Sequence, residues 1–179
     1  VGNLYGQGVN LILQGIPADD PAVDDEFTVT VYLENAGFSP QLLDGVEVHL
    51  DFDPAVLTVV GTSNISSSLL PIPLLTMQPA VDNAEGTISF VSGVIGGSRP
   101  AAPFGYITID FKAVAPGTSA IEFSQTLPRQ SNAAYNGSRV LLQTVGATVK
   151  VSHPDEGEDE DEEEDGYSAE VGCDDANPN

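Results

Sequence analysis

Apolar and polar residues alternate with a period of two along several stretches of the chain. Residues 26–35 have an apolar face and a polar face, formed by Phe27, Val29, Val31 and Leu33 and by Thr28, Thr30, Tyr32 and Glu34. The same alternation recurs in residues 46–52 and 106–113. A period of two that persists over six or more residues is typical of an antiparallel β-strand with one buried face. These stretches are therefore predicted to be strands.

Shorter stretches of the same kind extend the prediction to about nine strands. They are residues 9–15, 55–61, 86–94, 119–124, 139–143 and 146–151. Clusters of Gly, Pro, Asn and Asp between them favour turns, and no helical period is sustained. Two sheets that each have one apolar face can bury both faces by packing together. The expected fold is therefore all-β: an antiparallel jelly-roll or immunoglobulin-like sandwich, followed by an acidic tail without regular structure.

Residues 61–83 interrupt this regular pattern. The stretch "LLPIPLLTM" is apolar, but Pro71 and Pro73 disfavour a central strand. One interpretation is an edge strand or a loop that covers one end of the core. The other is an exposed apolar patch that binds a partner.

Charge is distributed very unevenly along the chain. It has 179 residues with 27 acids and five bases, a formal net charge of −22, and 13 of the acids follow Lys150. Such a surface repels phosphate groups, so we expect no nucleic-acid partner. No run of 18 apolar residues occurs, so we expect no transmembrane segment. We divide the chain into an N-terminal extension (1–8), a sandwich (9–152) and an acidic tail (153–179).

Ordered motifs in the sandwich resemble those of cohesin-type modules. The stretches "VDDEFTVTVYLENAG" and "VEVHLDFDPAVLTVVG" are similar to an early strand and to the Asp-Pro segment of that family. The stretches "GTISFVSGV", "FGYITIDFKAVAPGTSAIEF" and "GATVKV" follow in the family's order and resemble its later strands. The resemblance covers roughly residues 9–151.

The resemblance implies a jelly-roll sandwich that acts outside the cell or at its surface, in recognition or scaffolding and without catalysis. Cohesins bind calcium-loaded dockerin modules, and related folds bind polysaccharide. Protein partners are therefore expected for this chain. The resemblance implies no individual contact residue, because the contacting side chains vary between family members.

The acidic tail contains a candidate calcium site, although it also fits a solvated, disordered run of charge. Carboxylates at i, i+2 and i+4, followed by Gly166, place oxygen ligands around a sharp bend, as hard cations require. The segment resembles Asp-rich metal-binding repeats of bacterial surface proteins and thrombospondin type 3 repeats. It departs from an EF-hand at Gly172, where that motif has a bidentate Glu. The expected ligands are Asp161, Glu163, Asp165, the carbonyl of Tyr167, and Asp174 or Asp175.

Two Asn-X-Ser sequons, at Asn64 and Asn136, lie in turn-like stretches. They predict covalent glycans if the chain is secreted, although such triplets also arise by chance.

The first predicted strand has two alternative partners. Val9, Leu11 and Leu13 form its apolar face. In one arrangement the strand adds to an open sheet edge of a neighbouring copy and, with a calcium-stiffened tail, builds a head-to-tail filament. In the other arrangement it pairs within its own sandwich.

No motif of nucleophilic, zinc-dependent or phosphate-binding catalysis occurs, and His49 falls on the polar face of its predicted strand. We therefore expect no enzyme activity, and favour a structural or scaffold subunit of an extracellular assembly. The alternatives are a receptor module for a dockerin-like partner and a carbohydrate-binding module. For the last, the absence of Trp removes the usual platform for sugar stacking.

Overall fold

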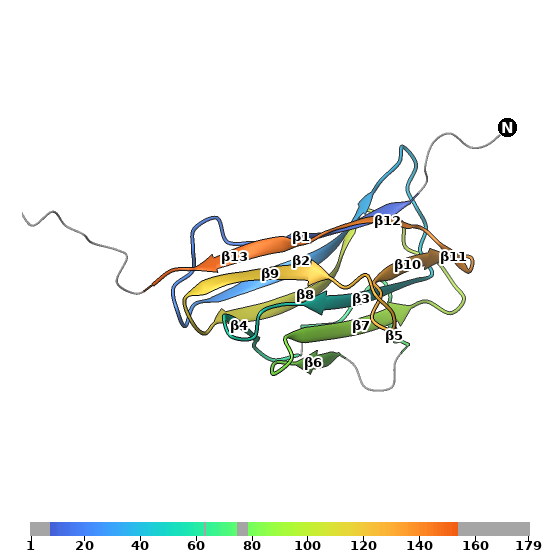
Figure 1. Ribbon diagram of the computed structural model, residues 1–179. Helices are drawn as coiled ribbons and strands as arrows, with labels where there is room; N and C mark the ends of the chain where they lie inside the picture. Colours follow the sequence, from blue (N-terminus) through green and yellow to red (C-terminus); the bar gives the residue numbers. More distant parts are fainter. Residues whose placement is uncertain (1–7, 63, 75–78, 154–179) are drawn as a thin grey trace, which may run out of the picture.

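The structure is a computed structural model and describes residues 8–62, 64–74 and 79–153. Within these ranges all regular elements are β-strands, and the 13 strands form two sheets packed face to face (Figure 1). No helix in the described part of the chain is long and apolar enough to cross a membrane. The calcium ligands predicted between Asp161 and Asp175 lie outside the described residues.

The first sheet has five strands in the order β12-β1-β2-β8-β4. Its neighbouring strands run antiparallel except β1 and β12, which are parallel. This pair departs from the antiparallel sheet expected from the sequence. The two strands lie at opposite ends of the sandwich sequence, so no hairpin fixes their relative direction. The bounds are β1 (Val9–Gln14), β2 (Glu26–Asn35), β4 (Leu57–Val59), β8 (Phe104–Ala113) and β12 (Leu141–Val145).

The second sheet has eight strands, with a central order of β11-β10-β3-β7-β5. In addition, β6 pairs with β7, and β9 pairs with both β3 and β13. The bounds are β3 (Gly45–Asp51), β5 (Ile72–Pro73), β6 (Ala80–Asp82), β7 (Thr87–Gly93), β9 (Gly117–Phe123), β10 (Asn132–Tyr135), β11 (Ser138–Arg139) and β13 (Ala147–Val151).

The strands predicted from alternation are all present. Four others, β5, β6, β10 and β11, have two to four residues each, too few to show a period in the sequence. Both β5 and β6 pair with β7, so residues 61–83 do contain edge strands. The same segment also covers the core with Ile65 and Leu70, while Leu69 and Leu74 are about half exposed.

The predicted apolar faces point into one continuous core between the sheets. Phe111 of β8 is fully buried and packs against Phe27 and Phe52, with ring centroids 5.8 Å and 5.4 Å away. Each large apolar side chain buried in this way contributes roughly 1.5–3 kcal/mol. The core therefore holds the two sheets, and with them their outer faces, in a fixed relation.

Tyr106 crosses this core from β8 to the opposite sheet. Its hydroxyl donates to the carbonyl oxygen of Val46 at 2.8 Å. It accepts from the backbone N–H of Ser92 at 3.1 Å and lies 2.9 Å from the Ser92 hydroxyl. Burial raises the pKa of the Tyr106 phenol, because a charged phenolate would lose its hydration.

The strand β1 has the intramolecular arrangement of the two considered for it. In this single chain it lies between β2 and β12 of its own sandwich. Val9 and Leu11 are fully buried, and Leu13 packs at the margin of the core. An exchange of this strand between copies stays a prediction.

Candidate functional site

Polar side chains of two adjacent strands line the outer face of the eight-stranded sheet. Glu47, His49 and Asp51 come from β3, and Thr87 and Ser89 come from β7. His49 lies directly opposite Ser89 in the pairing of these strands, and Asp51 lies opposite Thr87. The alternation of both strands sends the intervening apolar residues into the core, so this polar row is a direct product of the period of two.

His49 joins its neighbours in a hydrogen-bonded row. Its Nε2 lies 2.8 Å from Oε1 of Glu47, and its Nδ1 lies 2.7 Å from the hydroxyl of Ser89. A carboxylate can only accept, so in its neutral form the imidazole carries its hydrogen on Nε2 and accepts the Ser89 proton at Nδ1. The row therefore fixes the tautomer and the orientation of the imidazole ring.

His49 lies on the polar face of its strand, as the alternation predicts, but the side chain is buried there. Only 5% of its surface is exposed. The loop between β9 and β10, residues 124–131, is hydrogen-bonded at both of its ends to the backbone of His49. The N–H of Ser124 donates to the His49 carbonyl at 2.8 Å, and the Ser131 hydroxyl accepts from the His49 N–H at 3.0 Å. Figure 1 shows this loop crossing in front of β3.

Arg129 holds the loop against the sheet. Its guanidinium forms an ion pair with Asp51 of β3. Its Nη2 also donates to the backbone carbonyl of Leu50 at 2.8 Å and to that of Ile88, on β7, at 3.3 Å. One side chain thus bonds to both central strands, and the planar group allows little freedom for the loop that carries it.

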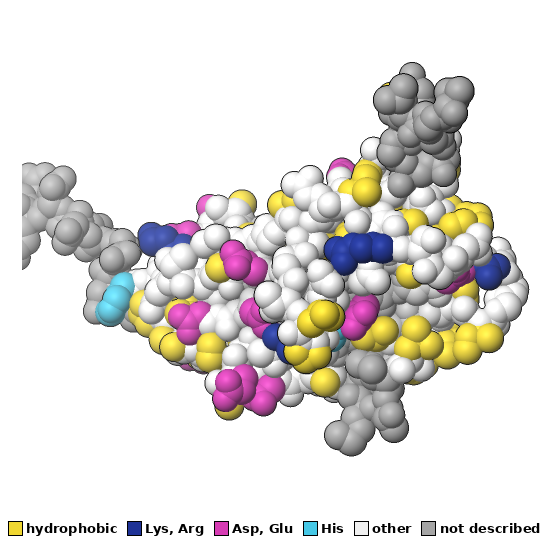
Figure 2. Space-filling model, turned by 45° about the vertical axis from the view of Figure 1, so that its right-hand side comes forward, with side chains coloured by type: hydrophobic (Ala, Val, Ile, Leu, Met, Phe, Trp, Pro, Cys, Tyr) yellow, Lys and Arg dark blue, Asp and Glu magenta, His cyan; other side chains and the backbone are white. Residues whose placement is uncertain are grey.

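The loop presents an apolar side chain to solvent. Leu127 is 83% exposed and lies two residues before Arg129. A hollow of about 660 Å³ lies between the loop and β6, lined by Pro79, Ala80, Val81, Asp82, Thr87, Ser89 and Arg129. Figure 2 shows apolar side chains standing beside acidic and basic ones on the visible face of the molecule. Single exposed apolar residues are common on protein surfaces, so it is the fixed loop and the adjacent hollow that make Leu127 a candidate contact residue.

The hydrogen bond between Ser89 and His49 resembles the contact between a serine nucleophile and its general base in acyl-transfer enzymes. Acyl transfer also needs backbone or side-chain donors aimed at a developing oxyanion. Ser89 lies in the middle of the sheet, paired with His49 on one side and with Ala80 on the other. Its backbone is therefore committed to the sheet, and the arrangement suits a fixed recognition surface better than a hydrolytic site.

Both predicted glycosylation sites are exposed. Asn64 lies in a turn, where its Nδ2 donates to Oδ2 of Asp110 at 2.6 Å. Asn136 lies in the tight turn between β10 and β11 with a φ of 49°, followed by Gly137 with a φ of 72°. The surface position agrees with the sequence-based expectation, and the glycans stay predictions.

Three residues define this face and are not predicted from the sequence, namely Ser89, Leu127 and Arg129. The stretch "SQTLPRQSN" looks like an ordinary turn. One signal was available: the chain has only five Lys and Arg residues, so a basic residue in a predicted loop is conspicuous.

No protein-family model and no curated protein matches the chain. Solved cohesin structures match it in fold. The third cohesin of ScaC from Acetivibrio cellulolyticus, solved with the ScaB dockerin, has a TM-score of 0.61 at 13% identity, covering 81% of this chain and 99% of that one. The OlpA cohesin of Clostridium thermocellum, solved with Doc918, has a TM-score of 0.60 at 16% identity, with the same coverage.

A longer structure also matches. The type II cohesin dyad from the ScaA scaffoldin of Acetivibrio cellulolyticus has a TM-score of 0.54 at 18% identity, over 80% of this chain. The match covers 48% of the dyad, so this chain spans about half of its length. These similarities establish that the chain has a cohesin-like β-sandwich fold.

Proposed function

We propose that this chain is a non-catalytic recognition module of an extracellular or cell-surface assembly. Its partner is a dockerin-like protein, which binds loop 124–131 and the hollow between this loop and β6. The proposal rests on one observation. Leu127 is 83% exposed on a loop that Arg129 holds by hydrogen bonds to the backbones of β3 and β7.

Loop 124–131 combines two properties that favour binding, an exposed apolar side chain and a fixed backbone. Burying a large apolar side chain in an interface contributes roughly 1.5–3 kcal/mol. A loop that is already held in place loses little conformational freedom when the partner binds, so more of that contribution appears as affinity. The charged and polar groups at the hollow beside the loop, among them Asp82 and Arg129, supply directional contacts that select among partners.

The structural comparisons support a partner of this class. The ScaC and OlpA cohesins were both solved in complex with dockerins. A shared fold with a preformed outer face makes a dockerin the first partner to test.

The test is calorimetric titration of the full chain with a panel of type I and type II dockerins in calcium. We expect at least one to bind, and we expect Leu127→Asp to weaken it about 30-fold, the loss of roughly 2 kcal/mol of apolar burial. The matched control is Leu142→Asp, which changes a 59% exposed leucine on the five-stranded sheet. The absence of binding across the panel, or equal effects of the two variants, would contradict the proposal.

We also propose that calcium binds the tail through Asp161, Glu163, Asp165, the Tyr167 carbonyl and Asp174 or Asp175. The described residues contain no group of three or more His, Cys, Asp or Glu side chains that could hold a metal. A chain ending at His153 is therefore a matched control. Calorimetry at millimolar calcium should give binding with the full chain and none with the shortened one, and equal heats from both would refute the site.

A head-to-tail filament is the more specific form of the scaffold proposal. Because β1 already lies between β2 and β12, strand exchange would first have to break that pairing. A junction through the calcium-loaded tail needs no such rearrangement. Electron microscopy of the full chain with and without calcium tests it: filaments that need calcium would support it, and particles that stay monomeric would exclude it.

A further inference from the structure

A polar groove lies on the outer face of the five-stranded sheet, where the proposed function has no use for it. It begins at a β-bulge in β8. The pairing of β8 with β2 steps from Ile107–Val31 to Gly105–Tyr32, so Tyr106 is an extra residue. Tyr106 and Ile107 are consecutive, yet each is only 2% exposed and points inward.

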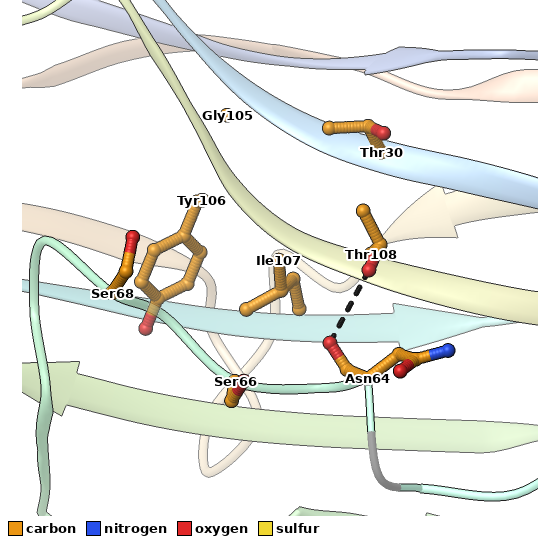
Figure 3. Close-up of a pocket in the computed structure, with 8 residues that line it drawn as sticks. All are labelled: Thr30, Asn64, Ser66, Ser68, Gly105, Tyr106, Ile107 and Thr108. Atoms are coloured by element: carbon orange, nitrogen blue, oxygen red, sulfur yellow. Dashed lines mark hydrogen bonds between the residues drawn. The ribbon is translucent and has the colours of Figure 1, made fainter.

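The bulge leaves the outer surface of the sheet bare at this point. Gly105 has no side chain, and the next side chain that points outward along β8 is that of Thr108. Figure 3 shows the hollow that results, with Thr30 of β2 on one side and Ser66 and Ser68 on the other. Its volume is about 330 Å³. Bulges commonly re-aim side chains beside functional sites.

The groove is preformed. The hydroxyl of Tyr106 is bonded to Val46 and Ser92 on the opposite sheet, which holds the bulge in place. The rim is also fixed, because the Thr108 hydroxyl donates to the Asn64 carbonyl at 3.3 Å. A ligand would therefore meet a surface that needs no ordering.

Free hydroxyl groups dominate the lining. The side-chain hydroxyls of Thr30, Ser66 and Ser68 have no hydrogen-bond partner within the described part of the chain. The lining residues carry no formal charge. The nearest carboxylate along β8, Asp110, accepts from the Thr28 hydroxyl and from the Asn64 amide, both at 2.6 Å.

This chemistry narrows the class of ligand. A phosphate or carboxylate ligand would need a cation in the lining, and a metal ion would need carboxylates. A lipid or an apolar peptide would leave the hydroxyls without partners. A neutral sugar offers several donors and acceptors around a ring that fits over a residue without a side chain.

We propose that this groove binds a neutral saccharide, with its ring over Gly105 and its hydroxyls bonded to Thr30, Ser66, Ser68 and Thr108. Tyr106 is the aromatic residue of the lining, and at 2% exposure it offers no stacking surface. Binding therefore rests on hydrogen bonds, and the dissociation constant falls in the millimolar range.

The experiment is a titration of the ¹⁵N-labelled full chain, followed by amide chemical shifts, with neutral oligosaccharides. Oligosaccharides of glucose and xylose represent a structural polysaccharide, and those of N-acetylglucosamine and mannose represent a glycoprotein. At least one of them should produce saturable shifts confined to residues 30, 64–68 and 105–108. Which of these two sets of oligosaccharides binds shows whether the natural ligand is a structural polysaccharide or a glycoprotein glycan.

Three variants make the test specific. Gly105→Val fills the groove and should abolish the shifts; its Cβ would lie 3.4 Å from Thr30 Cγ2, and unchanged amide shifts outside the groove check that the fold is retained. Thr30→Val removes one hydroxyl and should raise the dissociation constant about 2- to 12-fold. Thr58→Val, on β4 of the same sheet, should change nothing.

Each contrary outcome overturns the proposal. These outcomes are an absence of localised shifts with every saccharide at tens of millimolar, binding by Gly105→Val that equals wild type, and equal effects of Thr30→Val and Thr58→Val. Shifts confined to the eight-stranded sheet would overturn it as well.

Discussion

Two sites on the outer faces of the sandwich use polar residues in opposite ways. Beneath loop 124–131 the polar groups bond to one another, as Arg129 does with Asp51 and His49 with Ser89, and the apolar Leu127 of the loop is left exposed. In the groove beside β8, the hydroxyls of Thr30 and Ser66 are left free around a bare stretch of backbone.

Both faces come from the same alternating pattern, so the pattern alone does not explain the difference. An irregular feature shapes each face: a loop that folds back over β3 on one, and a bulge in β8 on the other. Local departures from the period of two therefore make the two faces different in shape and chemistry. The first face suits a protein with an apolar pocket, and the second suits a small polar ligand.

The largest expected effect comes from removing the anchor of the bulge. Tyr106→Ala should lower the free energy of unfolding by about 3–5 kcal/mol, as large-to-small core changes do. Tyr106→Phe should cost about 1–3 kcal/mol, because Val46 and Ser92 lose a buried partner. Urea denaturation measures both, with Tyr135→Phe on the partly exposed β10 as control. A Tyr106→Phe protein as stable as wild type would show that the anchor is unnecessary.

Alkaline pH should act on the same residue. The pKa of Tyr106 is raised in the folded protein, so the unfolded chain ionises first, near the ordinary phenol value of about 10. The stabilisation that comes from the neutral Tyr106 phenol is therefore complete below that pH. As pH rises above it, the free energy of unfolding falls by up to about 1.4 kcal/mol per pH unit. Denaturation at several alkaline pH values should show a steeper fall for wild type than for Tyr106→Phe. Parallel curves would be evidence against a buried neutral phenol.

Releasing loop 124–131 should have a smaller effect on the free energy of unfolding. It should also raise hydrogen exchange locally, next to the loop. Arg129→Met should cost about 1 kcal/mol, because the side chain is partly exposed and its ion pair is screened. Hydrogen exchange at the amide of His49, which donates to Ser131 of the loop, should accelerate, while that of β2 should not. Unchanged exchange at His49 would mean that other contacts hold the loop.

The smallest effect on stability should come from Leu127, the residue that we propose contacts the partner. Leu127→Asp should change the free energy of unfolding by less than about 0.5 kcal/mol, because the side chain is exposed. A loss above about 1 kcal/mol in thermal or urea unfolding would assign Leu127 a structural role and weaken the contrast between the two faces.

The sequence was sufficient to predict the longer strands and the sandwich, because alternation is a local signal, but not the parallel pair β1–β12 or the shortest strands. Residues 26–35 and 46–52 show their buried faces without reference to the rest of the chain. The features that make each face specific are long-range. Arg129 meets Asp51 across 78 residues, and the bulge at Tyr106 depends on partners 14 and 60 residues away. Such long-range contacts leave no periodic pattern in the local sequence. The loop and the groove could therefore be identified only from the three-dimensional structure.

The central claim is that the face covered by loop 124–131 is the one that binds a protein partner. The most direct measurement is cross-saturation NMR of the labelled full chain with the dockerin that binds it best. We predict signal loss in loop 124–131, β3 and β7, a much smaller loss in Leu127→Asp at the same concentrations, and no change at residues 30, 105 and 108. Signal loss centred on the five-stranded sheet, with binding that survives Leu127→Asp, would contradict it.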